Sequence, residues 1–559
     1  MVSKILGRIT APVRGLHQAA YLLAALTLAA QLLALLRDRI FAHSFGASET
    51  LDLYYAAFKV PDLVFALVAS LVSAYVLIPR IAGSGKKEAR ALISETTSFL
   101  LLVGGALCVV LAIFAPQVVF SFFPDFQDSS QADAFVLLVR ILLLQPLLLG
   151  LSGILTSVTQ IERKFFLFAI SPVLYNLGII FGTLFLYPIY GLSGIGIGVV
   201  IGALLHVGIH IPVVMKARLL PHFRFPSRAV IRSVVSDSAP RSMALGMSAV
   251  TTLVLAALAV QVGEGSVAIF TFASNLEAVP LALIGASYAT AAFPVLAEQM
   301  GQKKYEEFRA TLTAAARHLI FWSSAVLVLF IVLRAHIVRI ILGSGAFDWD
   351  ATRLTAAILA ILVLALIAQG FVLLASRAFY ASGKSWNPFF IQLGGVLVSG
   401  LSAWGMLKLS GSYPFLGYFV EALFRVEDVP GASILFIALG ALFGQLVMGV
   451  IAFITLKDVA PGVGKDLVRP LFEGLGAAIL GGSAAYGTLS FMGNIAPLSN
   501  LFLVFTQGAV AGMVGLVVSA GILVLLENKE FRDLYQTLRK LTSTRALSPS
   551  GSILDGPTQ

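Results

Sequence analysis

A few charged and amide side chains lie inside or at the edges of long apolar stretches of this sequence, where an unpaired charge is costly. These candidate substrate-binding residues are Arg37, Asp52, Lys59, Arg140, Asn275 and Glu277. Cationic side chains in a site shielded from bulk water bind phosphate or pyrophosphate through charge-assisted hydrogen bonds. We therefore predict a site for an anionic substrate, in which Arg37 and Lys59 contact phosphates and Asp52 holds a neighbouring cation or a gate.

Two prolines interrupt long apolar runs close to these residues. Pro61 follows Lys59, and Pro280 follows Glu277. Proline lacks a backbone N–H and breaks or kinks a helix. Interrupted helices at equivalent places in two halves of a transporter mark a substrate site between the halves. We interpret Pro61 and Pro280 as hinges.

No set of residues typical of an enzyme accompanies these charges. The GIGIG stretch at Gly194 lies inside an apolar run with no strand before it, so it is not a dinucleotide loop. No Walker A sequence is present, so ATP does not drive the chain directly. We predict a secondary-type transporter rather than an enzyme, with no catalytic residues, no metal and no cofactor.

The composition places these residues in a membrane. Of 559 residues, 58% are hydrophobic and only 12% are charged, against about 25% charged in soluble domains. Mean hydropathy is +0.94. Too few charges remain to cover a soluble surface, and the high hydrophobicity excludes disorder. Helices satisfy their own backbone in lipid, and the apolar runs are too long for barrel strands. The fold class is therefore an all-α polytopic membrane protein.

Fourteen apolar runs are long enough to cross a bilayer, which takes about 20 residues. They lie at 19–42, 50–80, 92–115, 132–158, 165–188, 192–215, 240–262, 266–297, 310–334, 352–379, 385–409, 430–456, 469–490 and 500–526. An even number of spans places both termini on the same side of the membrane. The first run is not followed by a cleavage site, so we interpret it as an uncleaved span.

The distribution of lysine and arginine orients the chain. With the N-terminus in the cytoplasm, 29 of the 38 cations lie on the cytoplasmic side and seven on the external side, while Lys59 and Arg140 lie within spans. This asymmetry follows the positive-inside rule and predicts cytoplasmic termini. It also accounts for the pI of about 9.6 without nucleic acid, because cytoplasmic cations contact anionic lipid headgroups.

The sequence repeats at an offset of about 215–220 residues. Pro79 matches Pro294, and the lysine at 164 matches Lys384. Spans 1–6 and 7–12 are thus two parallel repeats that form two lobes. The predicted organisation is a cytoplasmic N-terminus, an N-lobe, a basic cytoplasmic linker, a C-lobe, two extra spans and a cytoplasmic tail, at 1–18, 19–218, 219–239, 240–457, 458–527 and 528–559.

The segment RDRIFAHSFGASETLDLYYAAFKVPDL, from Arg37 to Leu63, resembles the opening of the MurJ/MviN lipid II flippases. SPVLYN at Pro172 and FYASGKSWNP at Phe379 are also similar to family segments. The chain departs from the family at Gln31 and at Ser274–Asn275, where family members carry charged residues. It is therefore identified as a divergent member.

The resemblance implies the fold of the multidrug/oligosaccharidyl-lipid/polysaccharide exporters. It implies a monomer in the bacterial plasma membrane that moves a lipid-linked peptidoglycan precursor, lipid II, from the inner to the outer leaflet for cell wall biogenesis. Alternating access of a central cavity would carry the headgroup, and the membrane potential or an ion gradient would supply the energy.

Three alternatives remain open at this point. A flippase for another polyprenyl-linked glycan would explain the loss of family arginines. A cation-coupled drug exporter on the same fold would use Glu277 as its acid. A non-transporting membrane scaffold would tolerate neutralisation of every cavity charge.

Overall fold

The computed structural model describes residues 16–68, 72, 74–495 and 500–536. All regular elements in these residues are helical, as the sequence predicts. The helices of the first half are α2 (Leu16–Phe45), α3 (Glu49–Ala57), α4 (Lys59–Leu67), α5 (Ala74–Ala82), α6 (Lys86–Phe99), α7 (Gly105–Ile113), α8 (Ala115–Phe122), α9 (Ala132–Leu142), α10 (Leu144–Ile161), α11 (Phe165–Phe181), α12 (Tyr187–Tyr190), α13 (Leu192–Gly208) and α14 (Ile211–Ala217).

The second half is built in the same way and is followed by two more long helices. Its helices are α15 (Arg228–Val260), α16 (Ser266–Pro280), α17 (Ser287–Gly301), α18 (Tyr305–Ile341), α19 (Trp349–Val363), α20 (Leu366–Ala381), α21 (Asn387–Ser412), α22 (Pro414–Phe424), α23 (Ile434–Leu456), α24 (Val463–Ile495) and α25 (Leu501–Leu525). Short π-helical turns at 100–104, 182–186 and 281–286 join α6 to α7, α11 to α12 and α16 to α17.

Within the described residues, eleven helices are long and apolar enough to span a membrane, or up to twelve when α19 and α20, bent by 49°, count as one. These correspond to twelve of the predicted spans. The other two, 19–42 and 50–80, fall on α2 and on the segment α3–α5. The multi-span membrane fold is confirmed, and the count of fourteen stays a prediction.

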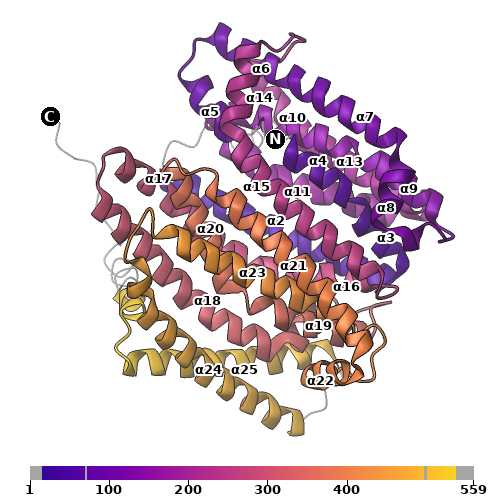
Figure 1. The fold of residues 1–559 in the computed structure, drawn as a ribbon, viewed down its shortest axis with the longest axis vertical. Helices are drawn as coiled ribbons and strands as arrows, with labels where there is room; N and C mark the ends of the chain where they lie inside the picture. The colour runs from indigo at the N-terminus through magenta and orange to yellow at the C-terminus, as the bar shows by residue number, and fades with distance from the viewer. Residues whose placement is uncertain (1–15, 69–71, 73, 496–499, 537–559) are drawn as a thin grey trace, which may run out of the picture.

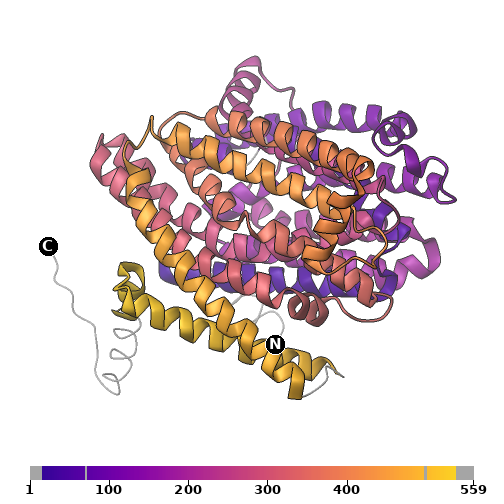
Figure 2. The ribbon, with the colours of Figure 1, turned by 60° about the horizontal axis from the view of Figure 1, so that its bottom comes forward.

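The two halves form separate lobes. Figure 1 shows α3–α14 together at the top and upper right, and α16–α23 together below and to the left of them, with α22 near the bottom. Helices α24 and α25 pack on α18 outside the second lobe, as the view in Figure 2 makes clear. We call the end of the bundle that holds loop 46–48 the first-loop end, and the end that holds 218–227 the linker end.

Both predicted prolines lie at irregularities of the helices. Pro61 is in the first turn of α4, directly after the break at Phe58. Pro280 ends α16, and a π-helical turn follows it. A proline cannot donate the hydrogen bond that would continue the preceding turn. The chain breaks near Pro61, whereas at Pro280 the helix continues through the π-helical turn into α17, and the hinge role of both prolines stays a prediction.

The predicted linker, 219–239, divides into two parts. Its first residues are extended, and from Arg228 onward the chain belongs to α15, which runs without interruption to Val260. The continuous helix begins at a strong N-cap, because the Ser227 hydroxyl accepts the Val230 N–H. The second half of the linker is therefore the start of the seventh predicted span.

The extended part is held against α6 by the buried side chain of Glu95. One Glu95 carboxylate oxygen accepts from the Ser227 backbone at 3.0 Å and from its hydroxyl at 2.7 Å. The other pairs with the Arg224 guanidinium at 3.0 Å. Ser98 accepts the Arg224 backbone N–H at 3.0 Å. These bonds fasten the connection between the lobes to the N-lobe.

Replacing Glu95 with Ala should release this connection. Loss of the hydrogen bonds to a buried carboxylate should cost about 2–3 kcal/mol of local stability. Trypsin should then cleave after Arg224 at least tenfold faster than in the parent. Glu306→Ala, which removes an exposed carboxylate at the start of α18, is the control, and equal cleavage rates in both variants would contradict the role of Glu95.

Candidate functional site

The charged residues of α2 form a network in the interior of the bundle. Arg37 donates from Nε to Asp38 Oδ1 at 3.0 Å and from Nη2 to the same oxygen at 2.8 Å. Its Nη1 donates to Asn176 Oδ1 at 3.1 Å. Asp38 is 2% exposed, so its charge is balanced almost entirely by Arg37.

The network joins the two lobes. Arg37 and Asp38 lie on α2, and Asn176 lies on α11 of the same lobe. Asn275, on α16 of the other lobe, donates to Asp38 Oδ2 at 2.9 Å. Each carboxylate oxygen of Asp38 thus accepts hydrogen bonds from a different lobe, Oδ1 from Arg37 and Oδ2 from Asn275. A change in the relative position of the lobes must break or remake this contact.

Arg37 keeps donors for a ligand. A guanidinium carries five N–H groups, and three are used by Asp38 and Asn176. The Arg37 side chain is 19% exposed and lies against the Phe41 ring, with 6.0 Å from guanidinium carbon to ring centroid. The two remaining N–H groups can reach an anionic oxygen while the network stays intact.

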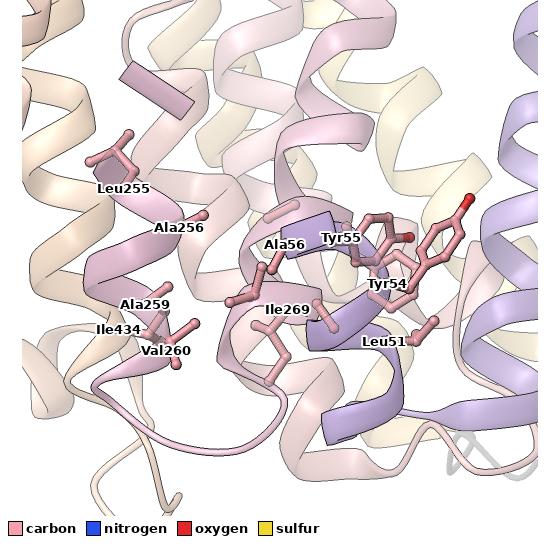
Figure 3. Packing of buried hydrophobic residues seen from close by; sticks show 14 of the residues in the cluster. Leu51, Tyr54, Tyr55, Ala56, Leu255, Ala256, Ala259, Val260, Ile269 and Ile434 are labelled. Atoms are coloured by element: carbon pink, nitrogen blue, oxygen red, sulfur yellow. The ribbon is translucent and has the colours of Figure 1, made fainter. Parts of the chain in front are cut away.

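Toward the first-loop end, the site is closed by apolar packing between the lobes. The Phe41 and Tyr54 rings meet edge to face at 5.0 Å between centroids, and Tyr55 meets Phe272 of α16 at 5.9 Å. Figure 3 shows α3 residues such as Tyr54 and Tyr55 beside residues of α15 and α16. This layer separates the Arg37 network from the first-loop end.

Asp52 fastens the lobes together beyond this layer. Its carboxylate accepts the backbone N–H groups of Gly265 at 2.7 Å and of Ala268 at 2.8 Å. Gly265 caps α16 and Ala268 lies in its first turn, so an N-lobe carboxylate satisfies the N-terminus of a C-lobe helix. Asp52 is 2% exposed. The structure thus places Asp52 in a contact between lobes.

Two close backbone approaches complete the closure. The Ala346 N–H donates to the His43 carbonyl at 3.0 Å. Gly46 has φ +65°, and a Cβ there would lie 2.4 Å from the Ala346 carbonyl oxygen. Gly345 has φ +61°, and a Cβ there would lie 2.3 Å from the His43 carbonyl oxygen. Arg39 donates to the Ile340 carbonyl at 2.6 Å, so backbone acceptors of α18 fix it in place.

Several of these contacts join positions that the sequence repeat makes equivalent. The Glu49 N–H donates to Glu264 across a separation of 215 residues. The two bonds of Asp52 span 213 and 216 residues. Residues separated by the repeat offset meet only near the axis that relates the two lobes. The first-loop contact therefore lies at this axis.

The remaining predicted residues are not brought into the Arg37 network by contacts of the described residues. Lys59 begins α4, half-buried, with Asp62 one turn on. Arg140 is exposed and donates to the Ala112 carbonyl at 2.9 Å. Glu277 is 5% exposed and accepts from Gln369 of α20 within the C-lobe. Of the predicted set, only Arg37 and Asn275 share one network.

Two members of the network were not predicted as site residues. Asp38 is adjacent to Arg37 in the sequence, and Asn176 is an isolated amide in an apolar run. A buried polar side chain needs a hydrogen-bond partner. This requirement could have indicated from the sequence that Asn176 bonds to another polar side chain, although the sequence does not identify that partner.

Comparisons with solved structures agree with this geometry. The structure titled "Lipid II flippase MurJ, inward closed conformation" superposes with a TM-score of 0.69 at 21% identity, covering 91% of this chain and 100% of the other. An inward-facing multidrug resistance MATE family transporter of the MOP superfamily superposes with a TM-score of 0.61 at 17% identity, covering 79% and 99%. The fold of this chain is therefore the one seen in these two transporter structures.

Sequence comparisons define the family within that class. The family model described as "Lipid II flippase MurJ" matches residues 41–415. The Lipid II flippase MurJ of Burkholderia cenocepacia is 24% identical over 400 residues, 69% of this chain and 77% of the relative. The Probable lipid II flippase MurJ of Thermotoga maritima is 26% identical, covering 64% and 73%. The chain belongs to the MurJ lipid II flippase family, a family of transporters rather than enzymes.

Replacing Asp52 with Ala should open the first-loop end. It removes two charge-assisted hydrogen bonds that are together worth about 3 kcal/mol, which corresponds to an equilibrium shift of roughly a hundredfold. Spin labels on Asp128→Cys and Glu427→Cys, both exposed and on opposite lobes, should report longer distances. Asp133→Ala, an exposed carboxylate nearby, should leave the distance distribution unchanged.

Replacing Gly46 with Ala should have the same effect for a steric reason. The added Cβ would collide with the Ala346 carbonyl oxygen, so the lobes cannot approach as closely. Gly191→Ala is a matched control, because Gly191 also has positive φ, +57°, but no atom lies near its Cβ position. If both variants gave the parent distance distribution between the same labels, the close approach at Gly46 would not control closure.

Proposed function

We propose that this protein translocates lipid II from the inner to the outer leaflet of the bacterial plasma membrane and so supports cell wall synthesis. Membership of the MurJ family supports this proposal. The observation that carries it is the Arg37–Asp38–Asn275 network, which joins the two lobes and leaves guanidinium N–H groups for an anionic oxygen. A pyrophosphate matches those donors in charge and geometry.

The proposed cycle follows from the contacts that must change. In the state described here the first-loop end is closed by Asp52, His43 and Ala346. The substrate headgroup would enter from the linker end and engage Arg37. Breaking the Asn275–Asp38 bond and the Asp52 cap would then let the lobes separate at the first-loop end and release the headgroup there.

The proposed orientation places the linker end and both termini in the cytoplasm. The excess of lysine and arginine on that side supports it. We also propose that the transporter acts as a monomer and that the membrane potential or an ion gradient supplies the energy. A unit charge crossing 100 mV gains about 2.3 kcal/mol, which is comparable to the strength of the Asp52 contact.

One observation favours a second candidate, a flippase for a different polyprenyl-pyrophosphate glycan. The network holds one arginine, and its C-lobe contribution is the neutral Asn275. A site with a single cation relies on the carrier lipid and the glycan for the rest of its affinity. The glycan selectivity of this chain would then differ from that of its relatives.

The test is rescue of bacteria depleted of their own lipid II flippase. The parent chain should restore growth and the appearance of lipid II in the outer leaflet. Arg37→Ala should lose both when compared at matched protein level, because the substrate loses its guanidinium donors. Lys408→Ala, which removes an exposed cation of α21, should rescue like the parent.

Two results would overturn parts of this proposal. Full rescue by Arg37→Ala would refute the role of the network. Failure of the parent to translocate lipid II, together with movement of another polyprenyl-linked glycan in the same vesicles, would favour the second candidate.

A further inference from the structure

A cavity of about 790 Å³ lies between α18, α19 and α24, near the first-loop end. Its walls are mostly apolar, from residues such as Val328, Ile331, Ile479 and Leu489. None of the residues that line it belongs to α2, α11 or α16. The cavity is therefore separate from the Arg37 network.

Three arginines line this otherwise apolar cavity: Arg334, Arg353 and Arg425. Arg353 is paired with Asp428 at 2.7 Å, and its hydrogen bond holds the pKa of this exposed loop carboxyl below its usual range. Among the described residues, neither Arg334 nor Arg425 forms an ion pair, and Arg334 donates only to the Ile331 carbonyl. Two guanidinium groups at the cavity thus lack a counter-charge.

The distribution of charges along the sequence also indicates that cations are concentrated at this cavity. Seven lysine and arginine residues lie on the external side, where the positive-inside rule predicts few of them. Five of these seven belong to the C-lobe. Arg339 adds to the three that line the cavity, because its guanidinium carbon lies 5.4 Å from the centroid of Trp349, another lining residue. The exceptions to the rule are therefore concentrated around one cavity.

The neighbouring helix α22 indicates the level of this cavity in the membrane. Its residues Phe415, Tyr418 and Phe419 are 75%, 67% and 58% exposed. It is a short apolar helix at the first-loop end, and its last residue, Phe424, lines the cavity together with Arg425. Exposed aromatic side chains at the end of a membrane bundle lie at the headgroup level.

We propose that this cavity binds an acidic glycerophospholipid of the leaflet at the first-loop end, the outer leaflet in the orientation proposed above. Arg334 and Arg425 hold the headgroup phosphate, and the apolar walls of α18 and α24 hold the acyl chains. Charge complementarity requires an anion, and the apolar lining requires that the anion carry hydrocarbon. The site would stabilise the attachment of α24 to the C-lobe.

The test uses the full-length protein and phosphatidylglycerol with a photoactivatable acyl chain. Labelled peptides from 479–489 of α24 report the occupancy of this cavity and exclude lipid bound elsewhere. In Arg334→Gln/Arg425→Gln, labelling should fall about tenfold or more, since each cation near a headgroup contributes about 1 kcal/mol. Labelling should be unchanged in Lys408→Gln, which removes an exposed cation of the same lobe that does not line the cavity.

The charge-preserving variant Arg334→Lys/Arg425→Lys should keep most of the labelling, and loss of the labelling in this variant would refute the electrostatic account even if the glutamine variant folds poorly.

Unlabelled phosphatidylglycerol should compete with the labelled lipid, whereas phosphatidylcholine and inorganic phosphate should not. Equal competition by phosphatidylcholine would reveal a merely apolar groove, and equal competition by phosphate a free-anion site. Competition by undecaprenyl pyrophosphate at a far lower concentration than phosphatidylglycerol would make the cavity a substrate site, and each of these three results overturns the proposal.

Discussion

The arrangement of the two lobes depends on how the carboxylate of Asp38 is neutralised inside an apolar bundle. A buried charge without a partner is costly, and Asp38 obtains its partners from both lobes, Arg37 on one side and Asn275 on the other. The ion pair within α2 does not itself depend on the relative position of the lobes, since both residues lie on one helix. The bond from Asn275 is the component that can exchange for water or a ligand at modest cost.

A second polar contact, at Asp52, is different in kind. It connects a carboxylate to the free backbone donors of α16, so it depends on the position of a helix end rather than on a side chain. Such a contact is either made completely or lost as the helix moves. The apolar layer of Tyr54 and Tyr55 lies beside it. Closure at the first-loop end therefore combines a polar contact at a helix end with an apolar layer between the lobes.

The sequence predicted the class of fold and the helix irregularities at Pro61 and Pro280, because each depends on local pattern, whereas the role of Arg37 in substrate binding stays a prediction. It could not predict which charges meet. Asn275 and Glu277 are two residues apart, and on a helix with 3.6 residues per turn they point in nearly opposite directions. Only the packing of α16 shows that Asn275 faces the other lobe while Glu277 faces its own.

The close approaches around the first loop leave no room for a side chain at two of its contact points. Where the lobes meet at the first-loop end, glycines of both lobes approach the backbone of the other lobe too closely for a Cβ. Gly46 and Gly265 both have positive φ, +65° and +80°, and each lies against a carbonyl of the opposite lobe. The glycine-containing turn is therefore required by the geometry of the closed state itself. Catalytic or binding chemistry is not needed to account for it.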